Sequence, residues 1–139
     1  MNIGFISCAK TKKVGYHPAG KLYDSTFFRA AFAYASRRCK KVFILSAKHG
    51  LLLPDERIRD YDFSLYGMAP REHERWAERA YARTKNILSP DDTLYFFCGS
   101  LYREPLMTLL SKTHTCHAPL EGLSIGQQLK WYKEHTPAS

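Results

Sequence analysis

Two aspartates flank a tyrosine in the segment Asp60-Tyr61-Asp62, which lies in a polar stretch of the chain. A carboxylate in such a segment can activate water, or stabilise the positive charge that develops on a sugar when its bond to a base is cleaved. The tyrosine ring offers a face on which an extruded base can stack. We therefore expect Asp60 or Asp62 to be catalytic, with a solvated loop held by pairs to Arg57 and Arg59 as the alternative.

A second set of candidates consists of small, hydroxylated or basic residues that follow the expected buried strands. Small residues let a ligand approach the backbone, and free amides with nearby lysines favour an anion. The pattern predicts a phosphate or nucleotide pocket, although tight strand-to-helix turns also require small residues. His49 follows Lys48, whose charge disfavours the protonated imidazole, so we expect a neutral ring that hydrogen-bonds a departing base, with a structural cap as the alternative. The candidate phosphate- or nucleic-acid-binding residues are Ser7, Cys8, Lys10, Thr11, Lys12, Lys13, Ser46, Lys48, Gly50, Tyr61, Gly99 and Ser100.

The 139 residues carry a net charge of +8, and the basic residues are unevenly distributed. Residues 1–50 carry ten Lys or Arg against Asp24 alone, a net charge of +9, whereas residues 51–139 carry eleven basic and twelve acidic residues, a net charge of −1. Such asymmetry favours a polyanionic partner, because basic groups gain free energy by displacing the counterions condensed on nucleic acid. We therefore predict DNA or a nucleotide as the partner, with a solubilising surface as the alternative.

Several other classes of site and location are disfavoured. No His, Cys, Asp or Glu cluster has the spacing of metal ligands, and neither a Walker sequence nor GxGxxG occurs, so we predict no metal and no cofactor. The apolar runs have the length of buried strands, so no membrane association is expected. Four scattered cysteines and the lack of a basic, apolar leader favour a reducing, cytoplasmic location. The oligomeric state is left open.

Hydrophobic patterning predicts four strands that alternate with helices. The expected strands are 2–7, 41–46, 93–98 and 114–118, and the expected helices begin at Asp24 or Ser25, Pro70, Leu101 and Ser124 and end at about Arg38, Leu88, Ser111 and Lys133. This order predicts a single α/β domain over residues 1–139, with three layers, a mostly parallel sheet of about four strands and helices on both faces. Ligands of such sheets bind at the carboxyl ends of the strands, where the candidates fall. The stretch 47–69 exceeds an ordinary connection, so we expect it to be functional or to contain short elements.

Three segments resemble a family of small bacterial and phage proteins known as a domain of unknown function. Residues 6–12 read ISCAKTK, which is similar to the CSKTK start of that group. Residues 44–52 read ILSAKHGLL and are followed by Pro54 and Tyr61-Asp62, which matches its central signature. The segment PLEGLSIG at 119–126 is also family-like. A related signature, SALYGLL followed by Pro and Tyr, marks the YaaA-like peroxide-stress proteins.

The resemblance implies a protein directed at nucleic acid. YaaA-like proteins are associated with DNA binding and protection from oxidative damage, and the smaller group resembles, more distantly, the α/β core of uracil-DNA-glycosylase-like enzymes. Cys-Ala-Lys-Thr at 8–11 replaces the water-activating loop Gly-Gln-Asp-Pro-Tyr-His of those enzymes, so the acid would be Asp60 or Asp62. The expected function is DNA glycosylase-like cleavage of an N-glycosidic bond to a modified base. A non-catalytic DNA-binding stress-response protein and a pocket for a free nucleotide or other phosphorylated small molecule are the alternatives.

Overall fold

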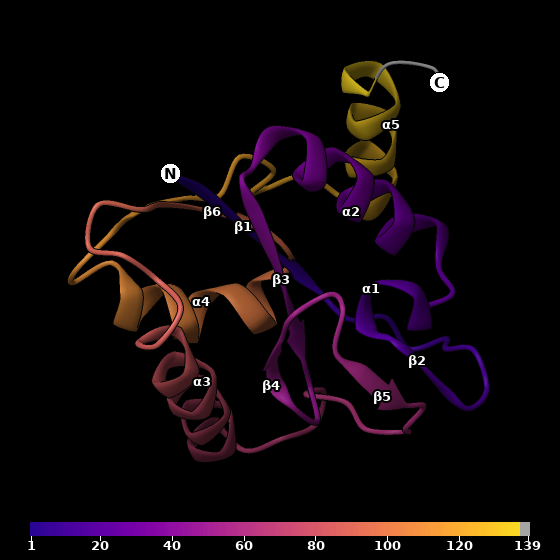
Figure 1. The fold of residues 1–139 in the computed structure, drawn as a ribbon, viewed down its shortest axis with the longest axis horizontal. Coiled ribbons are helices and arrows are strands. Elements are labelled where there is room, and N and C mark those ends of the chain that lie inside the picture. Colours follow the sequence, from indigo (N-terminus) through magenta and orange to yellow (C-terminus); the bar gives the residue numbers. More distant parts are fainter. Residues whose placement is uncertain (137–139) are drawn as a thin grey trace.

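The computed structural model describes residues 1–136 and confirms a mixed α/β fold built on one mostly parallel sheet (Figure 1). The strands lie in the order β4-β3-β1-β6-β7, and β4 alone runs antiparallel to its neighbour. The sheet has five strands where about four were expected. Their bounds are Asn2–Ser7 for β1, Lys41–Ser46 for β3, Gly50–Leu52 for β4, Thr93–Phe97 for β6 and Thr115–His117 for β7.

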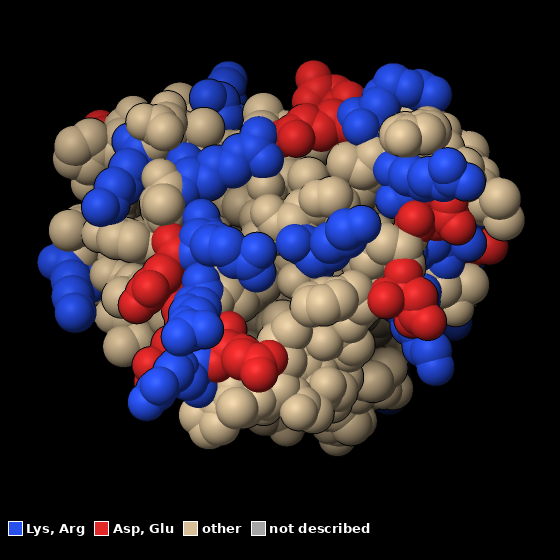
Figure 2. Space-filling view, turned by 90° about the horizontal axis from the view of Figure 1, so that it is seen from below, with Lys and Arg blue, Asp and Glu red and all other residues tan. Residues whose placement is uncertain are grey.

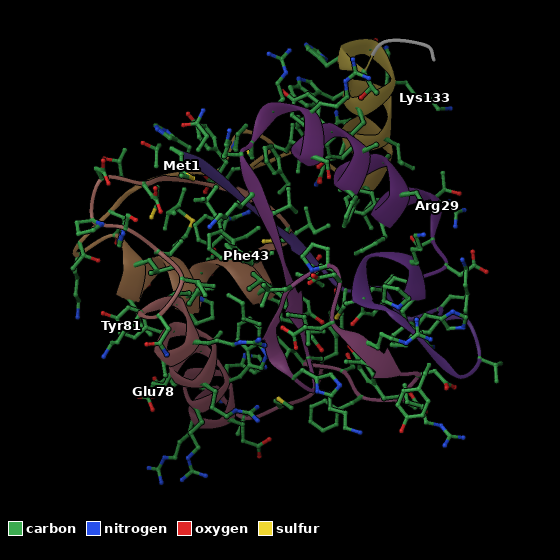
Figure 3. The ribbon with its side chains drawn as sticks, viewed as in Figure 1. Met1, Arg29, Phe43, Glu78, Tyr81 and Lys133 are labelled. Carbon is green, nitrogen blue, oxygen red and sulfur yellow. The ribbon has the colours of Figure 1, made fainter. Side chains whose placement is uncertain are left out.

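Helices cover both faces of the sheet. One face packs against α2 (Thr26–Arg38), α5 (Ile125–His135) and the short α1 (Ala19–Leu22), and the other against α3 (Pro70–Thr84) and α4 (Ser100–Leu110) (Figure 1). Successive side chains of a strand point to opposite faces, so Phe5 packs with α3 and α4 whereas Ile6 packs with α2. Figure 3 shows Phe43 in the interior and Arg29 and Lys133 at the periphery. The two predicted helical layers are therefore present.

Local capping signals set the helix starts that the sequence predicts. The Ser25 hydroxyl accepts a hydrogen bond from the Phe28 N–H at 3.2 Å, which begins α2. At α5 the Ser124 hydroxyl accepts from the Gln127 N–H at 3.2 Å, while the Gln127 side chain accepts from the Ser124 N–H at 2.9 Å, forming a capping box. Pro70 begins α3, because its fixed φ suits a first helical turn.

α3 ends four residues before the expected Leu88. The Thr84 hydroxyl donates to the Tyr81 carbonyl oxygen at 2.6 Å, and the Ile87 N–H donates to the Thr84 carbonyl oxygen at 3.1 Å. These bonds replace the helical ladder with a turn. The apolar Ile87 and Leu88 still pack against the core, which explains why the periodic pattern runs past the end of the helix.

The long stretch 47–69 and the loop after β1 both contain short elements. In the stretch 47–69, β4 lies beside β3, and β5 (Arg57–Arg59) pairs with β2 (Tyr16–Pro18) of the first loop in a separate two-stranded sheet. In this pairing Tyr16 faces Arg59 and Pro18 faces Arg57. The expectation that the long stretch contains short structure is thus confirmed. The β2–β5 pair was not foreseen, because it joins segments about 40 residues apart that carry no local hairpin signal.

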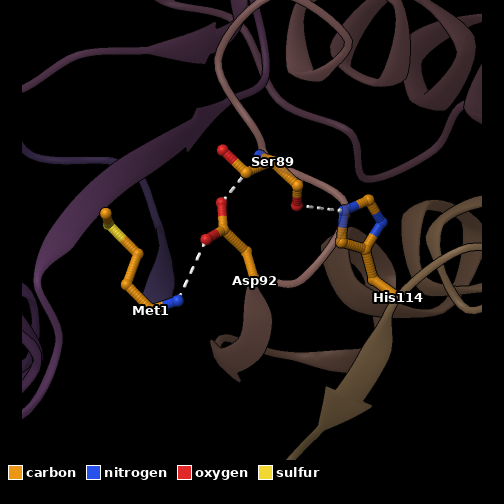
Figure 4. Close-up of polar contacts among 4 residues, drawn as sticks. All are labelled: Met1, Ser89, Asp92 and His114. Atoms are coloured by element: carbon orange, nitrogen blue, oxygen red, sulfur yellow. Dashed lines mark hydrogen bonds and ion pairs between the residues drawn. The ribbon is translucent and has the colours of Figure 1, made fainter.

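The four parallel strands β1, β3, β6 and β7 begin at the same side of the sheet, here called the amino edge. The Met1 amino group lies 3.1 Å from Asp92, which also accepts a hydrogen bond from the Ser89 N–H at 2.8 Å, and His114 Nε2 donates to the Ser89 carbonyl oxygen at 3.0 Å (Figure 4). Burial acts to raise the pKa of Asp92, but the Ser89 N–H and the Met1 amino group outweigh it and hold that pKa below its ordinary value. The amino edge is therefore held together by a buried, fully paired carboxylate.

Candidate functional site

The opposite edge, here called the carboxyl edge, centres on Tyr61. Its hydroxyl lies 2.7 Å from the Ser46 hydroxyl at the end of β3 and 2.8 Å from the Tyr23 hydroxyl. Ser46 and Tyr23 are buried, so the loop that carries Tyr61 is anchored to the sheet by its phenol oxygen. Burial, and with it the neighbouring Cys8, raises the pKa of Tyr61. The phenol therefore remains protonated and acts as a hydrogen-bonding anchor.

Two lysines lie near the ring of Tyr61. The Lys12 ammonium is 4.3 Å from the ring centroid and donates to the Lys10 carbonyl oxygen at 2.9 Å, and the Lys48 ammonium is 5.9 Å from the same centroid. The ring quadrupole attracts a cation in such a position. Burial lowers the pKa of Lys12, and the charges of Cys8, Asp62 and Asp60 oppose this shift. Two positive groups from separate loops thus converge on one aromatic ring.

His49 lies at the edge of the same ring. The two ring centroids are 5.4 Å apart and nearly perpendicular, and the His49 N–H donates to the Ser46 hydroxyl at 3.1 Å. Burial, followed by the charge of Lys48, lowers the pKa of His49 below its ordinary value of 6.5. The predicted direction is confirmed, and burial rather than Lys48 is its main cause. The imidazole is therefore neutral at pH 7 and can donate or accept a hydrogen bond.

Aromatic side chains of α3 and α4 contact the strand ends beside Tyr61. The Trp76 indole N–H, fully buried on α3, donates to the Ser46 carbonyl oxygen at 2.8 Å. Its ring meets that of Tyr102 from α4 edge to face, with centroids 5.4 Å apart. The Tyr102 hydroxyl in turn lies 3.4 Å from the Cys8 sulfur at the end of β1. We call Lys12, Tyr23, Ser46, Lys48, His49 and Tyr61 the Tyr61 cluster.

The two candidate carboxylates occupy different environments. Asp60 accepts a hydrogen bond from the Gly15 N–H at 2.8 Å and lies 3.9 Å from the Arg59 guanidinium, so it ties the β2 loop to the β5 loop. Asp62 is exposed, and its charge acts on Lys12 of the Tyr61 cluster. The alternative predicted for this segment, a loop held by a local Arg–Asp pair, therefore describes Asp60. Asp62 is the carboxylate with more freedom to meet a ligand.

The other predicted residues lie at the carboxyl edge without joining the cluster. Ser7 is half-buried at the end of β1, whereas Lys10, Thr11 and Lys13 are exposed in the following loop, and Gly99 and Ser100 are exposed at the start of α4. This loop is fixed by its backbone, because the Lys13 N–H donates to Leu22 and Thr11 accepts from Asp24. The side chains of Lys10 and Lys13 are therefore presented to solvent from a rigid loop.

Gly50 has a structural reason to be glycine. Its φ is +79°, and a Cβ at this position would lie 3.6 Å from the Ala80 backbone nitrogen of α3. L-residues with side chains rarely adopt this backbone conformation. Its buried position in β4 places it against α3, below the surface on which Lys48 and His49 are exposed.

Sequence reasoning missed three residues of this region, namely Tyr23, Trp76 and Tyr102. Tyr23 meets Tyr61 across 38 residues, and Tyr102 meets Cys8 across 94 residues. No local sequence pattern predicts contacts between residues so far apart in the chain. A weaker signal existed for Trp76 and Tyr102, because buried aromatics with a polar atom require a hydrogen-bond partner, but the sequence does not say which one.

One family model matches nearly the whole chain. A family model of unknown function, DUF6884, matches residues 3–134. The chain belongs to DUF6884. The predicted resemblance to a domain of unknown function is thereby confirmed for the DUF6884 chain, and its likeness to YaaA-like proteins and to uracil-DNA-glycosylase-like enzymes stays a prediction. No curated protein and no solved structure matches it.

The described part of the DUF6884 chain has neither a cluster of potential metal ligands nor a helix that could span a membrane. Across residues 1–136, no three His, Cys, Asp or Glu side chains gather as metal ligands would. Over the same residues, no helix has the length and apolar character needed to cross a membrane.

Proposed function

We propose that this DUF6884 chain acts on nucleic acid and that the Tyr61 cluster binds one nucleotide of DNA. The observation that carries the proposal is the convergence of the Lys12 and Lys48 ammonium groups on the Tyr61 ring, beside an imidazole that is neutral at pH 7. Two ammonium groups can hold a phosphate, while a neutral imidazole can hydrogen-bond the edge of a base. The Tyr61 ring lies next to both the two lysines and the imidazole, and so sets the distance between the phosphate site and the base site.

The charge of the surrounding surface supports the same ligand. Residues 1–50, which supply both lysines of the cluster, have a net charge of +9. Figure 2 shows basic residues spread over the face seen from below, with uncharged surface between them and fewer acidic groups. A polyanion gains affinity from such a face through counterion release, and a free mononucleotide gains less. This difference favours DNA over a free nucleotide.

The reaction that these groups suit is hydrolysis of an N-glycosidic bond. The bond between C1′ and the base nitrogen breaks and its electron pair leaves with the base. A water oxygen bonds to C1′ and keeps one proton as the new sugar hydroxyl, while the other water proton passes to the carboxylate and ends on the departing base. Asp62 would stabilise the positive sugar and take a proton from water, and His49 would hydrogen-bond the departing base. Residues 44–52 resemble the YaaA-like signature, and the smaller group more distantly resembles the α/β core of uracil-DNA-glycosylase-like enzymes. Both resemblances support this class of chemistry.

One assay tests both the binding and the reaction. The protein is incubated with plain DNA and with DNA carrying modified bases, and the alkali-labile abasic sites that form are counted. The affinity for the same DNA substrates is measured separately. We expect the wild-type protein to form abasic sites with at least one modified base. Asp62→Asn should lose this activity but keep its affinity for DNA, because the amide keeps the shape of the carboxylate and removes its charge. Asp55→Asn, another exposed loop carboxylate, is the matched control and should keep full activity. Full activity of both Asp62→Asn and Asp60→Asn would refute a carboxylate mechanism.

A non-catalytic DNA-binding role is the second candidate, and the position of Asp60 favours it. Because Asp60 is held by Gly15 and Arg59, only Asp62 is left to serve a reaction in this segment. Salt-sensitive binding of DNA without abasic sites on any modified substrate would select this role. Binding of a mononucleotide as tightly as DNA would instead select a free-nucleotide pocket and overturn the proposal.

A further inference from the structure

Three aromatic side chains are exposed on the segments that surround the Tyr61 cluster. The exposed fraction is 81% for Tyr66, 60% for Tyr16 and 45% for Phe63. Exposed aromatic faces cost free energy in water, because apolar area remains unburied. Scattered exposed apolar residues are ordinary, but three aromatics on segments that adjoin one polar cluster indicate a common ligand.

Tyr16 and Tyr66 lie on different sides of the cluster. Tyr16 follows Gly15, whose N–H is bonded to Asp60, the residue next to Tyr61. Tyr66 follows Leu65, which is fully buried in the core beside Trp76 and whose carbonyl oxygen accepts a hydrogen bond from His73 Nε2 on α3 at 2.7 Å. One exposed aromatic ring therefore adjoins the cluster on the side of β2, and another on the side of α3, whose Trp76 donates to the Ser46 carbonyl oxygen of the cluster.

Tyr16 is held in position by its partner strand. It faces Arg59 across the β2–β5 pair, with the guanidinium 5.9 Å from its ring centroid, and its carbonyl oxygen accepts from Arg57 at 3.3 Å. A rigid ring with arginines beside it presents one surface for a base and another for a phosphate. Sequence-tolerant proteins that bind single strands combine stacking rings with a basic track in this way.

We infer that the nucleic acid bound at this face is a single strand, with bases stacked on Tyr16 and Tyr66 on the two sides of the nucleotide held by the Tyr61 cluster. This inference rests on the proposed function and specifies its substrate class. In a duplex the faces of the bases are covered by their neighbours, so exposed aromatic rings gain nothing from it. An unpaired strand offers both the base faces and the phosphates that this basic, aromatic surface complements.

The test compares a fluorescently labelled single strand of about 15 nucleotides with its duplex, by anisotropy at several salt concentrations. We expect the single strand to bind at least tenfold more tightly. Tyr66→Ala and Tyr16→Ala should each weaken single-strand binding roughly 5- to 150-fold, the equivalent of about 1–3 kcal/mol per stacked base, without changing the salt dependence. Tyr66→Phe should retain affinity, because it keeps the ring. Ile125→Ala, at a residue that is 67% exposed on α5, is the matched control.

The outcomes separate this inference from the proposed function. Equal affinity for duplex and single strand, together with alanine variants at Tyr16 and Tyr66 that bind normally, would overturn the single-strand inference and leave the proposed function standing. Absence of salt-sensitive binding to either form would overturn both. A steeper or shallower salt dependence in Tyr66→Ala would also contradict the inference, since stacking neutralises no phosphate.

Discussion

The two edges of the sheet place charge in opposite ways. At the amino edge, Asp92 is buried and paired with the Met1 amino group and the Ser89 N–H. At the carboxyl edge, Lys12 and Lys48 lie over an aromatic ring, and within residues 1–136 neither forms an ion pair with an acid. A paired buried charge contributes to stability, whereas cations without an acidic partner are available to a ligand. Substitutions at the first edge should therefore change stability, and those at the second should change binding.

Gly50→Val should have the largest effect on stability. It is an exception among residues of the carboxyl edge, whose substitution should otherwise change binding. The residue lies at the carboxyl edge, but its φ of +79° and its contact with α3 make it part of the scaffold. A β-branched side chain is strained in this conformation, so we expect a loss of about 2–3 kcal/mol in the free energy of unfolding. Urea unfolding followed by circular dichroism measures it. Gly126→Ala, in the first turn of α5 where an added Cβ meets nothing within 4 Å, should not lower the free energy of unfolding, because alanine favours a helix.

Asp92→Asn should have the next largest effect. Removing the charge weakens two hydrogen bonds at the amino edge, and we expect a loss of about 1–2 kcal/mol, reduced because the Met1 amino group is half-exposed to solvent. The substitution should leave DNA affinity unchanged. A loss of DNA affinity without a loss of stability would contradict the assignment of the amino edge to stability and of the carboxyl edge to binding.

The same pair predicts a pH dependence with a definite sign. The folded-state pKa of Asp92 lies below its ordinary value of 3.8, so its contribution to stability is full above 3.8 and is lost as the pH falls through the folded-state value. The stability difference between wild type and Asp92→Asn should therefore be constant near neutrality and shrink below pH 3.8. Urea midpoints measured from acid to neutral pH check this. A difference that grows on acidification would contradict it.

Lys48→Ala should have the smallest effect on stability. Its side chain is exposed and its ammonium lies 5.9 Å from the Tyr61 ring, so the melting temperature should remain close to wild type. Loss of one phosphate contact should weaken DNA binding by about 1 kcal/mol, roughly fivefold in Kd, and flatten its salt dependence. Lys112→Ala, an exposed lysine outside the cluster, is the control. A lowered melting temperature with unchanged Kd would identify Lys48 as structural.

The predictable parts of this molecule are those decided by neighbours in sequence. The buried strands, the caps at Ser25 and Ser124 and the start of α3 at Pro70 follow from hydrophobic runs and local hydrogen bonds. The ends of the strands could also be placed, so Ser46, Lys48 and His49 were expected near one another. The roles of Tyr61 and Asp60 could not be foreseen. Tyr61 is fixed by the distant Tyr23, and Asp60 is fixed by Gly15, 45 residues away.

The central position of β1 has a consequence for how the chain assembles. β1 is made before both of its partners: β3 follows after α1 and α2, but β6 begins only at Thr93. The helix α5, which packs on the early α2, comes later still. During synthesis the β1–β3 pair therefore has an open strand edge and an incompletely covered apolar face until β6 and α4 have left the ribosome. Such pairing between distant segments slows folding, so chaperones that shield apolar surface would have their best opportunity in that interval.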